Sequence, residues 1–281
     1  MQGKAINKKL KAGISMSLIA QTISRLTDTS LMSVKLFCAL LFLISSTSVY
    51  ANNNPSVLRV AVASNFTPVL EQLLPAFTST TNIRVDIISG STGALYQQIQ
   101  HGAPFDIYLA ADNIRPQRLI AQNLAENLHT YAIGELALWS KHFSVNSLDA
   151  LNAQVTRLAI ANPKIAPYGK AAQQVLNHLD LWTVLKPKLI IGININQTFQ
   201  QTYSGATSLG IIAKSQLMLN NLQGFTIPKH YYTPIEQQLV IVSSSNKKPQ
   251  AEKFIQFLLS TKVQTQLATL GYLPQIKAND G

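Results

Sequence analysis

The hydrophobic positions from residue 58 onward follow two alternating spacings. Short apolar runs such as 58–63 are bounded by small or polar residues, which is typical of buried strands. Intervening segments such as 67–78 carry apolar residues three and four positions apart, which is typical of amphipathic helices. The chain therefore predicts an α/β protein in which strands and helices alternate.

The predicted elements continue in this order to the end of the chain. Strands are expected at 58–63, 83–88, 106–110, 136–139, 157–160, 188–191, 209–212 and 238–242. Helices are expected at 67–78, 93–101, from about 114, and at 169–179, 195–203, 249–259 and 262–270. Short β-α-β units of this kind build parallel sheets, whose ligands bind beyond the carboxyl ends of the strands.

The order of elements indicates two lobes. We expect a discontinuous first lobe, 52–133 with 239–281, and an inserted second lobe, 134–238. Each lobe is expected to be a mainly parallel sheet flanked by helices, and two crossover strands would join the lobes. A division into two consecutive domains fits the composition equally well.

The N-terminal segment has the features of an export signal. Lys35 precedes an apolar run at 36–44, and Val49 and Ala51 stand at the small-residue positions of a cleavage site. Spanning a bilayer takes about 20 apolar residues, so this run is too short for a membrane anchor. We expect cleavage after Ala51, which leaves a periplasmic chain that begins at Asn52.

The expected signal changes the composition of the protein. Residues 1–31 are longer than such a signal needs, so we expect translation to begin at Met32 or Met16; a genuine N-terminal extension is the alternative. Removing 1–51 removes six lysines and arginines and one aspartate, and the formal charge falls from +11 to +6. The single cysteine, Cys38, is removed as well, which excludes disulfides and thiolate metal sites. The remaining basic residues form no run of the kind that nucleic-acid binders show.

Three predicted strand-to-helix junctions share an unusual composition. They are 63–67 (ASNFT), 89–93 (SGSTG) and 192–196 (GININ), and each is rich in small hydroxyl or amide residues without a cation. One interpretation is helix capping, because Ser, Thr and Asn satisfy the free N–H groups at a helix start. The other is an anion site, in which several helix N-termini and hydroxyls donate to one ligand. The two interpretations are compatible.

The absence of charge at these junctions restricts the kind of anion. A phosphate that still carries a proton needs an acceptor, whereas a fully deprotonated oxyanion needs donors only. Hydrogen bonds to a charged partner contribute about 1.5–3 kcal/mol each. Several neutral donors can therefore hold a sulfate-like dianion without a counter-ion.

Other chemistry-bearing residues have simpler interpretations. Asp106 and Asp112 flank a predicted strand and could form an acid-base pair, but capping of the next helix by Asp112 is the preferred interpretation. Tyr231 and Tyr232 are similar to the tyrosine pair of ferric-ion carriers, but the neighbouring Pro228, Lys229 and Pro234 favour the return segment before the second crossover. The five histidines show no metal-ligand spacing. Because the chain has neither a Gly-x-Ser-x-Gly nor a His-Glu-x-x-His motif, a hydrolase is the least favoured class.

The three junctions and several further phrases resemble those of the periplasmic molybdate-binding proteins of ABC importers. The further phrases are 102–112 (GAPFDIYLAAD), 161–163 (ANP) with 166–169 (APYG), and 204–205 (SG) with 209–210 (LG). Their order and spacing resemble that family from Leu58 to Leu273. The resemblance implies the type II two-lobed periplasmic binding fold and a protein that is not an enzyme.

The resemblance also implies a set of ligand-binding residues. Ser64 and Asn65 match the pair that follows the first strand, and Thr92, with Ser91 beside it, matches the hydroxyl of the second loop. The second lobe would contribute Tyr168 and the main-chain N–H of Ile195. Some members use a tyrosine after the later Leu-Gly strand, where this chain has Ala213, so Tyr168 is expected to supply the tyrosine.

The function implied is capture of molybdate or tungstate and its delivery to an ABC permease in the inner membrane. No cofactor, directly bound metal or nucleic-acid partner is expected, and the protein is expected to be a monomer. A carrier of sulfate or of ferric ion on the same fold is the alternative.

Overall fold

The structure is a computed structural model that describes residues 56–153 and 155–273. The expected export signal, residues 1–51, lies outside the described residues. Among the helices of the described part, none has the length and apolar character to cross a membrane.

The first sheet has five strands in the order β2-β1-β3-β10-β4. The strands are β1 (Ser56–Ala63), β2 (Ile83–Gly90), β3 (Ile107–Leu109), β4 (Ala125–Gly134) and β10 (Ile235–Val242). The strand β1 lies between β2 and β3 and pairs in parallel with both. The strand β10 runs antiparallel to β3 and β4.

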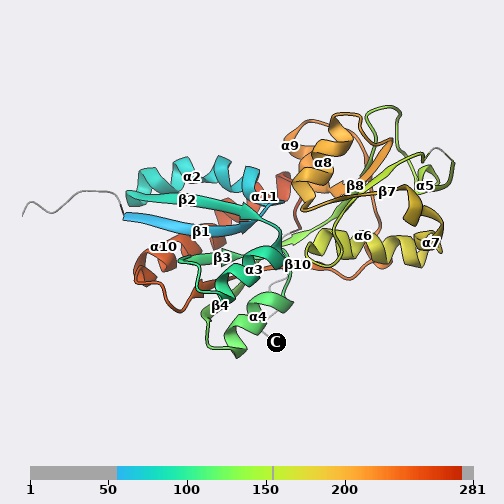
Figure 1. Cartoon of the computed structure of the whole chain (residues 1–281). Helices are drawn as coiled ribbons and strands as arrows, with labels where there is room; N and C mark the ends of the chain where they lie inside the picture. Colours follow the sequence, from blue (N-terminus) through green and yellow to red (C-terminus); the bar gives the residue numbers. More distant parts are fainter. Residues whose placement is uncertain (1–55, 154, 274–281) are drawn as a thin grey trace, which may run out of the picture. The chain divides into compact units, whose positions relative to one another are not determined.

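Helices cover both faces of this sheet (Figure 1). They are α2 (Thr67–Thr81), α3 (Thr92–Gln100), α4 (Ile114–Ala121), α10 (Lys248–Leu259) and α11 (Thr261–Thr269). Successive strand residues point to opposite faces, so Leu58, Val60 and Val62 pack on α2, α10 and α11. Ala61 on the other face packs with residues of α3 and α4. Burial of β1 on both faces explains its nearly uninterrupted apolar sequence.

The second sheet also has five strands, in the order β7-β6-β8-β5-β9. They are β5 (Leu136–Trp139), β6 (Leu158–Ala161), β7 (Leu189–Gly192), β8 (Leu209–Ala213) and β9 (Phe225–Thr226). One face packs against α6 (Pro167–His178) and the short helices α5 (Ala150–Ala153) and α7 (Trp182–Leu185). The other face packs against α8 (Ile195–Tyr203) and α9 (Lys214–Leu219). Two 3-10 turns, η1 (Lys186–Lys188) and η2 (Lys229–Tyr231), complete the elements.

Both sheets are mixed rather than mainly parallel. Each has two parallel strand pairings, made by β1 in the first sheet and by β6 in the second. The antiparallel pairings involve β4, β5 and β10. These strands adjoin the two segments through which the chain runs from one sheet to the other. The chain leaves the first sheet at Gly134 and returns to it at Ile235, and these two residues are partners in the β4–β10 ladder. Because the chain leaves and returns side by side, β10 must run opposite to β4.

Candidate functional site

A small cavity lies beyond the carboxyl ends of β1, β2, β6 and β7, where ligands of open α/β sheets bind. All six residues expected to bind ligand line it, and each residue in its lining is uncharged. The lining consists of Ala63, Ser64, Asn65, Gly90, Ser91, Thr92, Ala111, Ala166, Pro167, Tyr168, Asn194 and Ile195. Residues distant in sequence therefore meet at one point, and their polar groups define what the cavity can bind.

The loop after β1 contributes Ser64 and Asn65, both buried. The Ser64 N–H donates to the Gly90 carbonyl oxygen at 2.9 Å, which fixes this loop beside the end of β2. The Ser64 hydroxyl has no hydrogen-bond partner among residues 56–153 and 155–273. It is therefore available as a donor to a ligand in the cavity.

Asn65 is held differently, because its side-chain amide is already engaged. Its Nδ2 donates to the Gln237 Oε1 at 2.9 Å and to the Tyr272 hydroxyl at 3.2 Å. The Tyr272 hydroxyl donates in turn to the Asn65 carbonyl oxygen at 3.1 Å. The main-chain N–H of Asn65 has no acceptor within the described residues, so this N–H, and not the amide, is the group that can bind a ligand.

The loop after β2 contributes two hydroxyl groups at the start of α3. Ser91 is the N-cap residue, and its Oγ accepts from the Ala94 N–H at 3.4 Å. The Thr92 Oγ1 accepts from the Ala111 N–H at 3.1 Å. Both hydroxyls accept in these bonds, so each keeps its own proton for donation. The capping interpretation and the ligand interpretation of this junction are thus compatible in the structure.

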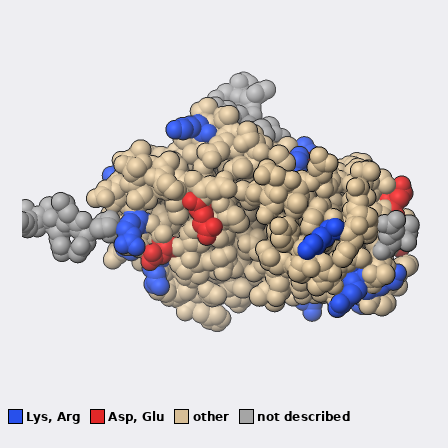
Figure 2. Space-filling view, turned by 90° about the horizontal axis from the view of Figure 1, so that it is seen from above, with Lys and Arg blue, Asp and Glu red and all other residues tan. Residues whose placement is uncertain are grey.

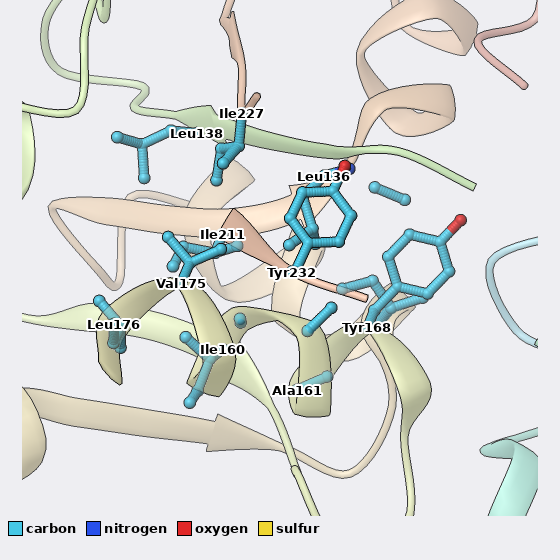
Figure 3. Close-up of a cluster of buried hydrophobic side chains, with 14 of the residues drawn as sticks. Leu136, Leu138, Ile160, Ala161, Tyr168, Val175, Leu176, Ile211, Ile227 and Tyr232 are labelled. Atoms are coloured by element: carbon cyan, nitrogen blue, oxygen red, sulfur yellow. The ribbon is translucent and has the colours of Figure 1, made fainter. Parts of the chain in front are cut away.

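Tyr168 lies in the first turn of α6, only 2% exposed. In Figure 3 its ring lies at the edge of a cluster of buried apolar side chains, with the hydroxyl directed away from Ala161. Burial raises the pKa of Tyr168 well above its ordinary value, and the neighbouring tyrosines raise it further, whereas the hydrogen bond from Gln237 acts in the opposite direction. The hydroxyl is therefore protonated and neutral at physiological pH.

The start of α8 contributes main-chain donors. Asn194 is the N-cap residue, and its Oδ1 accepts from the Gln197 N–H at 2.9 Å. The N–H groups of Ile195 and Asn196 have no acceptor in the part of the chain that the structure describes. Because the first N–H groups of a helix carry partial positive charge, they favour an electron-rich ligand atom beside Ile195.

Two hydrogen bonds connect the helices α3 and α4 of the first sheet to the loop before α6, next to the cavity. The Gly93 N–H donates to the Ile165 carbonyl oxygen at 2.8 Å, and the Arg115 Nη2 donates to the Lys164 carbonyl oxygen at 3.2 Å. A wider groove of about 340 Å³ adjoins the cavity and shares Ala111, Ala166 and Pro167 with it. The groove is bordered by four basic residues, Arg115, Arg118, Lys164 and Lys170, and by the single acidic residue Asp112. On the face that Figure 2 shows, broad uncharged areas separate most of the charged side chains.

The two aspartates have structural contacts. Asp106 accepts from the Arg59 N–H at 2.8 Å and from the Ser245 hydroxyl at 2.6 Å, and it pairs with Lys247 at 3.4 Å. The Asp112 Oδ1 accepts from the Arg115 N–H at 3.1 Å, which is the expected capping contact at the start of α4. Because the carboxylates of Asp106 and Asp112 both have these structural partners, we do not assign them an acid-base role.

The tyrosine pair and two of the histidines have packing contacts in the second sheet's half of the chain. The Tyr232 hydroxyl accepts from the Leu136 N–H at 3.1 Å, and its ring packs in the apolar core of the second sheet (Figure 3). The Tyr231 ring contacts His178 edge-on and His230 at a tilted angle. No group of three or more His, Cys, Asp or Glu residues within metal-binding distance occurs in residues 56–153 and 155–273.

Gln237 is the residue that the sequence motifs did not indicate. It is fully buried on β10 and contacts Asn65, Tyr131 and Tyr168. The signal that could have revealed it is a pair of glutamines, 237 and 238, directly before the apolar run 239–242 of a buried strand. A buried polar side chain in such a strand requires partners.

The family model for bacterial extracellular solute-binding proteins matches residues 58–273. The chain belongs to this family of solute-binding proteins, which are not enzymes. Among curated relatives, the molybdate-binding protein ModA of Azotobacter vinelandii is 38% identical over 224 residues, which cover 76% of this chain and 88% of the relative. ModA of Rhodobacter capsulatus is 33% identical over 220 residues, which cover 76% and 87% of the two chains.

Solved structures confirm the fold class. The periplasmic molybdate-binding protein of Azotobacter vinelandii has a TM-score of 0.74 and 37% identity, and the match covers 78% of this chain and all (100%) of that one. The sulfate-binding protein SubI of Mycobacterium tuberculosis has a TM-score of 0.65, with 79% and 88% coverage. At 14% identity, the second likeness concerns the fold alone.

Proposed function

We propose that this protein captures molybdate or tungstate outside the cytoplasm and delivers it to an ABC permease. The observation that carries the proposal is the cavity, in which Ser64, Asn65, Ser91, Thr92, Tyr168 and Ile195 present neutral donors and no charge. The relatives named as molybdate-binding proteins, at 38% and 33% identity, support the choice of ligand.

The chemistry of the donors favours a fully deprotonated tetrahedral oxyanion. Such an ion has acceptor atoms only, and the free groups of the cavity are hydroxyls and main-chain N–H groups, which can all donate. A protonated phosphate would need an acceptor for its own hydrogen, and no Asp or Glu is among the residues that line the described cavity. The start of α8 supports negative charge beside Ile195 through its free N–H groups.

The size of the cavity supports binding by motion of the lobes. Its volume is about 10 Å³, which is about the space that holds one water molecule. A tetrahedral oxyanion is larger, so the walls must separate to admit it and then close around it. Two connections between the sheets, at Gly134–Leu136 and before Ile235, are suited to the hinge motion by which such proteins close.

The lobes and the cellular location belong to the same proposal. Lobe 1 would comprise residues 52–133 with 239–281, and lobe 2 residues 134–238, which assigns one five-stranded sheet to each lobe apart from the crossover part of β10. The family of extracellular solute-binding proteins supports a periplasmic location. We also propose that the segment before Asn52 directs export and that the protein is a monomer.

Molybdate and tungstate are proposed together because both present the same four acceptor oxygens at nearly the same size. Calorimetric titration of the purified protein with molybdate, tungstate, sulfate, phosphate and ferric citrate tests the proposal. We expect one molybdate or tungstate per chain and much weaker binding of the other three solutes. Strong sulfate or ferric binding, or no binding of molybdate and tungstate, would overturn it.

A further inference from the structure

The hydroxyl of Tyr168 lies where both connections between the sheets pass. A Cβ added at Gly134, the last residue of β4, would stand 2.2 Å from the Tyr168 hydroxyl oxygen. On the other connection, the Gln237 Nε2 donates to this oxygen at 3.1 Å. A side chain of the second sheet's helix α6 thus contacts both β4 and β10 of the first sheet, and Gln237 is its polar partner there.

The orientation of the Gln237 amide is set by its other end. Its Oε1 accepts from the Asn65 Nδ2 at 2.9 Å. The Tyr131 hydroxyl lies 3.0 Å from the same oxygen and 3.1 Å from the Ala110 carbonyl oxygen, and its one proton serves one of these two acceptors. Tyr131 is fully buried, and burial raises its pKa well above the ordinary value, so its hydroxyl keeps the proton that it donates. With the Asn65 amide donating at Oε1, the NH₂ end of Gln237 faces Tyr168.

This orientation determines the direction of the Tyr168 proton. The Gln237 Nε2 donates to the tyrosine oxygen, while the two protons of the Asn65 Nδ2 are directed to Gln237 and Tyr272. A hydroxyl that accepts on one side sends its own proton to another side. Tyr168 lines the cavity, and the Tyr168 hydroxyl makes no donated bond to any residue of 56–153 or 155–273. The cavity is therefore where the proton can be used.

We propose that Gln237 is a positioning residue for anion capture: it holds the Tyr168 hydroxyl as a hydrogen-bond donor toward the cavity and links that donor to Asn65. The inference rests on the proposed function and adds a residue that does not itself touch the anion. Because Gln237 lies at the return of the chain into the first sheet, its bonds to Asn65 and Tyr168 form together only when the lobes are together.

The test replaces Gln237 by methionine, which has a similar length but cannot hydrogen-bond the tyrosine. The affinity for molybdate, measured by calorimetry, should fall at least tenfold in Q237M. The matched control is Q238M, because Gln238 is the next residue on the same strand and points to the opposite face. Gln238 bonds Thr130 at 3.2 Å and receives a 3.5 Å bond from Gln117. Q238M should bind within about twofold of the wild-type protein.

A double-mutant cycle separates positioning from a general structural role. If Gln237 acts through Tyr168, most of the loss caused by Q237M should disappear in a Tyr168→Phe background. Thermal unfolding of the free proteins should show comparable losses for Q237M and Q238M, because both remove buried hydrogen bonds. An equal loss of affinity with and without the tyrosine hydroxyl would overturn the inference.

A second variant covers the case in which Q237M does not fold. Gln237→Glu keeps the size and polarity of the side chain, but a carboxylate can only accept and would draw the Tyr168 proton away from the cavity. Q237E should therefore lose more affinity than Q237M, and wild-type affinity in Q237E would overturn the inference. If the wild-type protein binds none of the oxyanions, the proposed function fails as well. Tight wild-type binding that neither Gln237 variant weakens refutes the inference alone.

Discussion

The main-chain N–H of Gly93, at the start of α3, donates a 2.8 Å hydrogen bond to the carbonyl oxygen of Ile165, in the loop before α6. A Cβ at position 93 would stand 3.0 Å from both the Cα and the carbonyl oxygen of Ile165. These are backbone atoms, so they cannot turn aside as a side chain would. A side chain at 93 would keep the two loops apart.

Gly93→Ala should therefore weaken molybdate binding by about tenfold, since overpacking of a close contact costs about 1–3 kcal/mol. The free protein can relieve the clash by separating the loops, and alanine suits the first turn of a helix better than glycine does. The melting temperature of the free protein should then stay near that of the wild type. Calorimetry and thermal unfolding provide the two measurements, and unchanged affinity would contradict the prediction.

Thr92→Val tests the hydroxyl at the start of α3 without changing the shape of the side chain. Binding should weaken tenfold or more, because a hydrogen bond to a charged ligand contributes about 1.5–3 kcal/mol. The matched control is Thr202→Val. Thr202 is equally buried in α8, and its hydroxyl donates to the Thr198 carbonyl oxygen at 3.1 Å, outside the cavity lining. The control should lose stability and keep its affinity; an equal affinity loss in both variants would point to an indirect effect.

Gly134→Ala tests the close approach of Tyr168 to β4. The added methyl group would stand 2.2 Å from the tyrosine oxygen and 2.8 Å from the Gln237 Nε2, so it must displace both. We expect an affinity loss of at least tenfold and a loss of stability of about 1–3 kcal/mol. Calorimetry and urea unfolding measure these effects. Wild-type affinity would mean that the position of the tyrosine hydroxyl does not matter for binding.

The buried tyrosines predict a loss of stability at high pH. Burial raises the pKa of Tyr272 to about 12, and it raises the pKa values of Tyr108, Tyr131 and Tyr168 as well. Above pH 10 the unfolded chain ionises these groups while the folded chain keeps them protonated, so the unfolded state is favoured as pH rises. The contribution of these tyrosines to the free energy of unfolding should be constant below pH 10 and should fall between pH 10 and about 12.

Urea unfolding over this pH range measures the effect, with Tyr272→Phe as the comparison. Each tyrosine with a raised pKa lowers the free energy of unfolding by up to about 1.4 kcal/mol per pH unit in this range. The variant lacks one such group, so its free energy of unfolding should fall less steeply. Equal slopes in the two proteins would contradict the assignment to Tyr272.

Much of the fold follows from the spacing of apolar residues, and the exceptions have identifiable causes. The strand β4 was not predicted, because its residues from Glu126 to Thr130 are largely polar and partly exposed, and Asn127 has a positive φ of 55°. Its pairing with β10 is irregular at two places. The strand β10 begins at Ile235, earlier than the expected 238, because the polar side chain of Gln237 is buried by contacts with Asn65, Tyr131 and Tyr168, which lie far from it in sequence.

The candidate site, like the fold, could be predicted from the sequence only in part. Junction composition and family resemblance indicated six residues, and the structure brings all six to one cavity; their role as ligands stays a prediction. The sequence could not show that the Asn65 amide is engaged by Gln237 and Tyr272, since these partners lie 172 and 207 positions away. Local patterns report on neighbours in sequence, whereas this network depends on the return of the chain through β10.

The uncharged lining has a consequence for the loaded protein. A captured dianion makes the complex more negative than the empty protein by the charge of the ion, and because no lysine or arginine lines the described cavity, no cation beside the ion offsets that charge locally. Loaded and empty forms should therefore migrate differently in native electrophoresis. A membrane partner with a basic contact surface would favour the loaded form through this difference in net charge alone.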